Sequence, residues 1–134
     1  MYFKLFISIF SVMYLSSSLI AKELSLTKEL HFGKVTHNKT VVGVVKGFDT
    51  KRYKFRVREN QTLTVDLESD LVHFNIYRPN KSSPDGAIFL GKSQGKHFSG
   101  VLKENGRYMI RVFLAEGKRV EDEKTIFRMH ITLE

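Results

Sequence analysis

Strict alternation of apolar and polar residues constrains the fold of this chain more than any other feature. The pattern is clearest in the segments 53–58, 63–68, 72–77, 107–114 and 127–133. Successive side chains of a β-strand point to opposite faces, so each segment predicts a strand with one buried face. Further candidates are 24–32, 40–46, 87–90 and 96–102, and no window of ten or more residues carries a helical stripe. The sequence therefore predicts about eight or nine short strands.

So many short strands in one chain predict an all-β fold, an antiparallel β-sandwich. Two sheets can cover each other's apolar faces, which a single open sheet cannot do. Turn residues separate the strands. Asn60 stands where the chain reverses, and asparagine is the non-glycine residue that best tolerates positive φ. Asn105-Gly106 is the strongest hairpin signal in the chain, directly ahead of a predicted strand.

The first 21 residues predict a secretory signal peptide rather than part of the fold. Lys4 is followed by the apolar run LFISIFSVMYL, small serines come next, and charge returns only at Lys22. That order is typical of a signal peptide. We expect cleavage after Ala21, with Ser18 as the alternative site, leaving residues 22–134 as one β-sandwich domain. An uncleaved membrane anchor is the other alternative, since the apolar stretch 5–20 is of marginal length for a bilayer.

Cysteine content and charge indicate the compartment and the partners. The chain has no cysteine, so a disulfide framework and a lipid-modified N-terminus are both unavailable. A bacterial periplasm fits this composition best. The formal charge is +8, and removal of Lys4 with the signal peptide leaves +7. An exported basic chain without an RNA-binding signature is expected to meet acidic proteins, lipids or glycans, not nucleic acid. We expect no stable membrane insertion after cleavage.

No catalytic constellation is found in the sequence, so we expect a protein that is not an enzyme and needs no cofactor. Histidines 31, 37, 73, 97 and 130 lack metal-ligand spacing. A thiol nucleophile, a Gly-x-Ser-x-Gly motif and a phosphate-binding glycine loop are all missing. His73 and His130 are expected to be ordinary surface histidines. The run Glu121–Glu123 could hold calcium, but it lacks the turn glycine that such loops use, and we expect no metal.

Three stretches of the chain together resemble a known family. They are GFDTKRYKFRVRENQTLTVDLES, VHFNIYRPN and ENGRYMIRVF, starting at residues 47, 72 and 104. Their order is similar to that of small sandwiches related to pre-peptidase C-terminal domains and, within that group, to the periplasmic inhibitors of g-type lysozyme. The corresponding features here are the corner Gly47-Phe48-Asp49, the Gly106-Arg107-Tyr108 strand start, Arg111-Val112 and the charged loop 115–124.

This resemblance implies a function and a set of binding residues. It implies an exported lysozyme inhibitor, most closely of the g-type, that inserts loops from one end of the sandwich into the acidic active-site cleft. The residues implied to contact lysozyme are Phe48, Asp49, Arg111, Lys118 and Arg119. Phe48 stands where the family pattern has tyrosine. Glu116 stands where it has a basic residue, and the acidic run after Arg119 also departs from it.

Several residues of the implied binding site also have a simpler, purely structural interpretation. The stretch 116–124 is interpreted alternatively as a solvated hairpin loop. Phe48 has the alternative of a core or staple aromatic at the sandwich end, and Arg111 that of a solvated strand residue or a cross-strand charge partner. Two alternative functions stay open. One is an envelope-binding or glycan-binding module using outward-facing Tyr77 and His73; the other is a structural partner of an envelope protein, which predicts an exposed apolar patch. Lysozyme class and oligomeric state are open.

Overall fold

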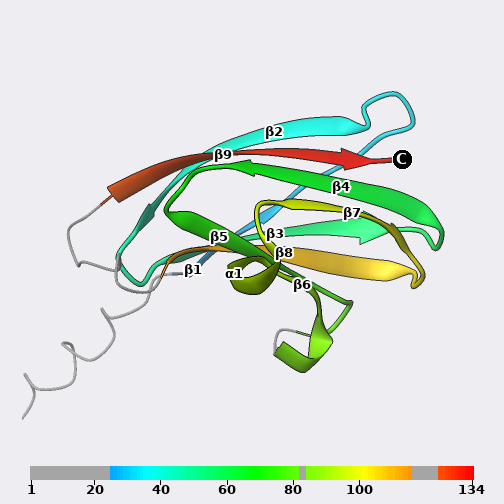
Figure 1. Cartoon of the computed structure of the whole chain (residues 1–134). Helices are drawn as coiled ribbons and strands as arrows, with labels where there is room; N and C mark the ends of the chain where they lie inside the picture. Colours follow the sequence, from blue (N-terminus) through cyan, green and yellow to red (C-terminus); the bar gives the residue numbers. More distant parts are fainter. Residues whose placement is uncertain (1–24, 82–83, 116–123) are drawn as a thin grey trace, which may run out of the picture.

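The computed structural model describes residues 25–81, 84–115 and 124–134, and these ranges form a β-sandwich of nine strands (Figure 1). The predicted signal peptide lies outside them. The strands are β1 (Ser25–Glu29), β2 (Asn38–Lys46), β3 (Thr50–Val57), β4 (Gln61–Glu68), β5 (Val72–Tyr77), β6 (Ala87–Leu90), β7 (His97–Leu102), β8 (Gly106–Leu114) and β9 (Lys124–Leu133). The only helices in the described ranges are short: η1 (Pro84–Gly86) and α1 (Gly91–Gln94). No helix there is long and apolar enough to cross a membrane.

The strands form two sheets that pack face to face. The five-stranded sheet has the order β1-β3-β8-β5-β6, and the four-stranded sheet has the order β2-β9-β4-β7. All pairs are antiparallel except that of β1 with β3, which is parallel and sets Ser25 beside Thr50. The all-β sandwich predicted from the alternation is therefore confirmed, with one parallel pair at a sheet edge.

The core lies between the sheets and is built from the apolar side chains that point inward at every second position of each strand. On β3, for example, Tyr53, Phe55 and Val57 are buried, while Lys54 and Arg56 between them are more exposed. Rings stack within this core: the centroids of Phe74 and Phe89 lie 4.8 Å apart. Burying a side chain of this size contributes about 1.5–3 kcal/mol. With no cysteine in the chain, apolar burial holds the domain together without covalent crosslinks.

Of the two turns predicted from the sequence, one is confirmed and the other is not the predicted hairpin. Asn60 has φ 71°, as its position at a chain reversal predicted. Asn105-Gly106, in contrast, does not close a hairpin, because β7 belongs to the four-stranded sheet and β8 to the five-stranded sheet. Gly106 has φ 140°, which favours glycine, and the Asn105 side-chain oxygen accepts a hydrogen bond of 2.8 Å from the Glu59 amide. The dipeptide therefore makes a sheet-to-sheet corner.

Candidate functional site

A tight corner at one end of the sandwich carries the aromatic residue that the sequence singled out. The corner passes from β2 in one sheet to β3 in the other. Gly47 has φ 56°, a conformation that glycine adopts without strain, and the Asp49 amide donates a hydrogen bond of 2.9 Å to the Lys46 carbonyl. Between them, the Phe48 side chain is 55% exposed. Phe48 is therefore presented at the surface, and the alternative of a core aromatic is wrong.

Strand pairing brings the ends of β8 and β9 to the same end of the molecule as this corner. Thr50, the first residue of β3, pairs with Phe113 near the end of β8. Lys46, the last residue of β2, pairs with Lys124, the first of β9. The described strand ends that flank the charged stretch 116–123, the end of β8 and the start of β9, thus lie beside the corner, at the left of Figure 1. Lys118 and Arg119 themselves lie outside the described residues, as do Glu116 and the acidic run.

Arg111 lies on the outer face of the five-stranded sheet, three residues before the end of β8. It pairs with Arg52 on β3 and with Asn75 on β5. Its guanidinium carbon lies 5.3 Å from the centroid of the Phe113 ring, within the range of a cation–π contact. The Arg111 Nε is buried and has no hydrogen-bond partner among the described residues. Arg111 is therefore partly packed on the sheet face and is not a freely solvated strand residue.

An exposed apolar patch lies near the corner; the structural-partner alternative predicts such a patch, but the sequence interpretation did not locate its residues. Val42, Val44 and Ile126 are 59%, 42% and 71% exposed, and they lie on the outer face of the four-stranded sheet. Val44 pairs with Ile126, two residues from the Lys46–Lys124 pair that flanks the corner. The signal was present in the run VVGVV, 41–45, which is apolar on both faces of its strand. A strand that faces only water on one side has no need of such residues.

The outward-facing pair proposed for glycan binding is not an open platform. Tyr77 is only 2% exposed, and its hydroxyl accepts a hydrogen bond of 3.0 Å from the Asn75 side chain. Asn75 is itself engaged, since its side-chain oxygen accepts from the Gly91 amide at the start of α1. The centroid of His73 lies 5.8 Å from that of Phe113. Tyr77 cannot stack on a sugar in this arrangement, so the glycan alternative loses the residue on which it was based.

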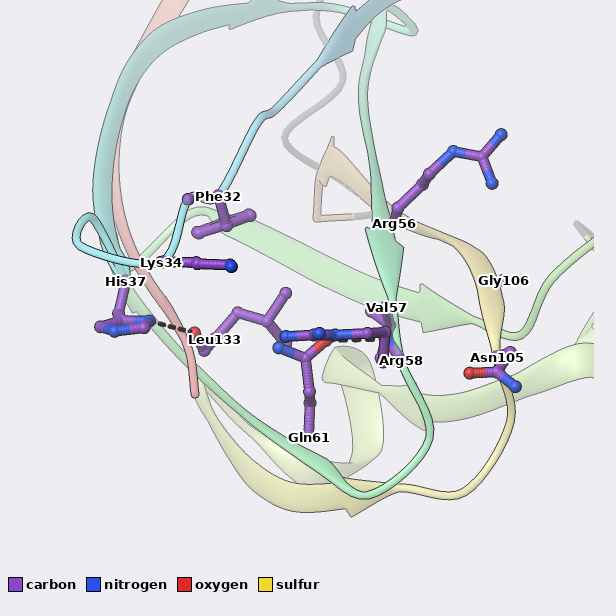
Figure 2. A pocket seen from close by; sticks show the side chains of 11 residues that line it. Phe32, Lys34, His37, Arg56, Val57, Arg58, Gln61, Asn105, Gly106 and Leu133 are labelled. Carbon is purple, nitrogen blue, oxygen red and sulfur yellow. Dashed lines mark hydrogen bonds between the residues drawn. The ribbon is translucent and has the colours of Figure 1, made fainter.

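A cavity of about 610 Å³ lies at the other end of the sandwich (Figure 2). It is bounded by the end of β3, the start of β4 and the end of β9. Phe32, Val57 and Leu133 give it apolar walls. Figure 2 shows the side chains of Lys34 and Arg58 extending toward its middle. Because the corner and this cavity lie at opposite ends, the cavity is not part of the surface around Phe48.

His73 on β5 and His130 on β9 lie on outer strand faces and are half-buried. His130 contacts Glu68 through Nε2, at 3.0 Å from the carboxylate oxygen. The pKa of His73 is lowered, first because burial disfavours the charged form and then because Lys96 and Lys92 lie nearby. Within the part of the chain that the structure describes, no three His, Asp or Glu side chains gather as a metal site would require.

Comparison with solved structures identifies proteins of the same fold. The chain superimposes on Aeromonas hydrophila PliG, a periplasmic lysozyme inhibitor of g-type lysozyme, with a TM-score of 0.74 and 23% identity, covering 84% of this chain and 99% of that one. For Salmonella Typhimurium PliG, also a periplasmic lysozyme inhibitor of g-type lysozyme, the TM-score is 0.63 and the identity 16%, covering 81% of this chain and 98% of that one. For a mutant of the Escherichia coli PliG, the TM-score is 0.63 and the identity 17%, covering 83% of this chain and 99% of that one.

Other comparisons gave no match: no protein-family model matches the chain, and no curated protein does. The identities to the three inhibitors are low, so what they share with this chain is the fold. The resemblance inferred from three sequence stretches is confirmed at that level. Nearly the whole of each inhibitor is covered, and the chain therefore has the β-sandwich architecture of the periplasmic inhibitors of g-type lysozyme.

Proposed function

We propose that this protein is an exported inhibitor of g-type lysozyme that acts by binding, with no catalytic activity of its own. The observation that carries the proposal is the placement of an exposed aromatic, Phe48, beside the strand ends that flank the charged stretch 116–123. A loop pair at one end of a rigid sandwich is a shape that can enter a cleft. The described fold is also that of three proteins named as inhibitors of this enzyme class.

The chemistry of the target supports a cationic and aromatic binding end. A lysozyme cleft holds carboxyl groups that protonate a glycosidic oxygen and stabilise developing positive charge. Lys118 and Arg119 would set cations against those carboxylates, and arginine can add two directed hydrogen bonds. Phe48 would bury aromatic surface next to the charges, a combination frequent at binding hot spots. Arg111 and Asp49 are proposed to border this contact.

The exposed patch of Val42, Val44 and Ile126 fits a protein partner better than a sugar. Apolar residues clustered on the outer face of a sheet favour contact with another protein surface. The patch lies two residues from the corner end of the four-stranded sheet. In the proposed complex it would lie at the edge of the contact, where lysozyme can cover part of it.

The test is the lysis of wall-containing bacterial substrate by g-type, c-type and i-type lysozymes, with and without the purified protein. We expect the g-type enzyme alone to lose activity at micromolar protein or below. The loss should be saturable and should follow the amount of protein added. If all three enzymes keep full activity at micromolar protein, the inhibitor proposal fails and an envelope-binding module becomes the leading function.

Export is the second part of the proposal and is tested separately. We propose that residues 1–21 are removed as a signal peptide and that residues 22–134 act in the periplasm. When the full chain is expressed in a Gram-negative host, the protein recovered from the periplasmic fraction should begin at Lys22, as read by intact mass. A start at Leu19 would indicate cleavage after Ser18. Recovery of the uncut chain in the membrane fraction would contradict export by a cleaved signal.

A further inference from the structure

The outer face of the five-stranded sheet carries a cluster of cations, of which only Arg111 is also proposed to border the lysozyme contact. β3 supplies Arg52, Lys54 and Arg56 to this face, since they alternate with its buried residues. The antiparallel register sets Arg52 opposite Arg111 and Arg56 opposite Arg107. Like charges directly opposite each other across a strand pair are destabilising. The sheet thus holds a repulsion that a bound anion would relieve.

A hollow of about 260 Å³ lies within this cluster. Its lining includes Arg52 and Lys54 from β3, Arg107 from β8, and Arg78 and Lys81 from the segment that follows β5. No carboxylate lines it among the described residues. Pockets for drug-sized ligands are about 300–1,000 Å³, so this hollow suits a compact charged group and not an extended ligand.

Carboxylates near the hollow offset only part of its charge. Glu29 pairs with Arg107, and the Glu104 Oε1 lies 4.0 Å from the Arg78 Nη1. The side chains in both pairs are 37% to 55% exposed, and ion pairs of that kind are weak. Five cations less two carboxylates leave a charge of about +3 around the hollow. The local field therefore favours an anion of more than one charge.

Two guanidinium groups that line the hollow, those of Arg52 and Arg78, differ in how their donors are engaged. The Arg52 Nε is buried and has no hydrogen-bond partner among the described residues. An unmet buried donor is costly. Arg78 is already positioned, because its Nη2 donates a hydrogen bond of 3.1 Å to the Asp85 carbonyl. The site thus combines one oriented guanidinium, that of Arg78, with one whose Nε lacks a hydrogen-bond partner among the described residues.

We infer that this hollow binds an anion bearing phosphate groups, of the diphosphate or phosphomonoester class. The planar fork of arginine matches the oxygens of phosphate, and lysine adds a compact charge. The same chemistry is available from a soluble phosphate compound and from a phosphorylated lipid headgroup at a membrane surface. Binding here does not depend on lysozyme binding, because the hollow lies on a sheet face and the Phe48 corner lies at the sandwich end.

The test compares two doubly substituted proteins of equal net charge. The site variant is Arg52→Gln, Lys54→Gln, and the control variant is Lys34→Gln, Arg58→Gln, whose residues line the separate cavity opposite the Phe48 corner. Pyrophosphate binding is measured by titration calorimetry at fixed ionic strength, since exposed charges are screened by salt. In a second arm, sedimentation measures binding to phosphatidylcholine vesicles with and without phosphatidic acid.

We expect the site variant to bind at least tenfold more weakly than the unsubstituted protein and the control variant to bind within twofold of it. Such a loss in the pyrophosphate arm indicates a soluble ligand, and a loss confined to phosphatidic acid vesicles indicates a headgroup; both support the site. Equal weakening in the two variants would show attraction by overall charge only and would overturn the inference. Absence of binding in both arms would overturn it as well, while leaving lysozyme inhibition unaffected.

Discussion

The Phe48→Ala variant is expected to inhibit g-type lysozyme about thirtyfold more weakly than the unsubstituted protein. An aromatic hot-spot side chain costs 2 kcal/mol or more when it is truncated, and 1.4 kcal/mol is a tenfold change in affinity. Because the Phe48 ring is 55% exposed, its removal should leave the free energy of unfolding within about 0.5 kcal/mol. The measurement is the concentration of protein that halves the lysis rate, with urea unfolding alongside.

The control for Phe48 is Val35→Ala, which removes an apolar side chain that is 92% exposed and precedes β2 near the other end of the sandwich. This variant should inhibit as well as the unsubstituted protein. A Lys118→Ala, Arg119→Ala variant tests the charged stretch independently and should also lose inhibition. If Phe48→Ala inhibits fully while the Lys118, Arg119 variant does not, the aromatic corner lies outside the contact and the proposed binding end is wrong in that part.

The Phe74→Ala variant is expected to lower the free energy of unfolding by about 3–5 kcal/mol, the usual cost of deleting a buried ring. The Phe74 side chain is fully buried and stacks on Phe89 at 4.8 Å between centroids. Urea unfolding followed by circular dichroism measures the change. Small domains are stable by only about 5–15 kcal/mol, so this single change would remove a large share of the total.

Ile126→Ala is the matched control for the core substitution, because it also removes an apolar side chain, but one that is 71% exposed on the outer face of β9. Its free energy of unfolding should change by about 0.5 kcal/mol or less. A cost below 1 kcal/mol for Phe74→Ala would show that the core between the sheets can close around the gap, contrary to the tight packing described above.

The strands were predictable from sequence because alternation is a local property, whereas the pairing of strands is not. Each of the nine strands falls on a predicted segment. Asn105-Gly106 was misread because a turn dipeptide fixes the backbone of a reversal, not the sheet that the next strand joins. The parallel pairing of β1 with β3 could not be predicted either, because it depends on which sheet edge is open to the first strand.

The candidate site, too, could be predicted from the sequence only in part. The corner at Gly47 was predictable because the chain must turn between two alternating segments, and the exposure of Phe48 follows from its place at the tip. Tyr77 was misjudged because alternation gives the direction of a side chain but not what covers it. Its outward hydroxyl is held by Asn75, which in turn contacts the start of α1, a residue distant in sequence.

The parallel pairing of β1 has a consequence for the proposed export. Ser25 pairs with Thr50, so the first described strand begins at the same end of the sandwich as the Phe48 corner. Ser25 is only four positions after Ala21, and an extended chain over that interval reaches about 14 Å. A precursor still attached to the membrane by its leader would therefore hold this end against the bilayer. In the proposed pathway, the cleavage that frees the domain would also uncover the proposed binding end.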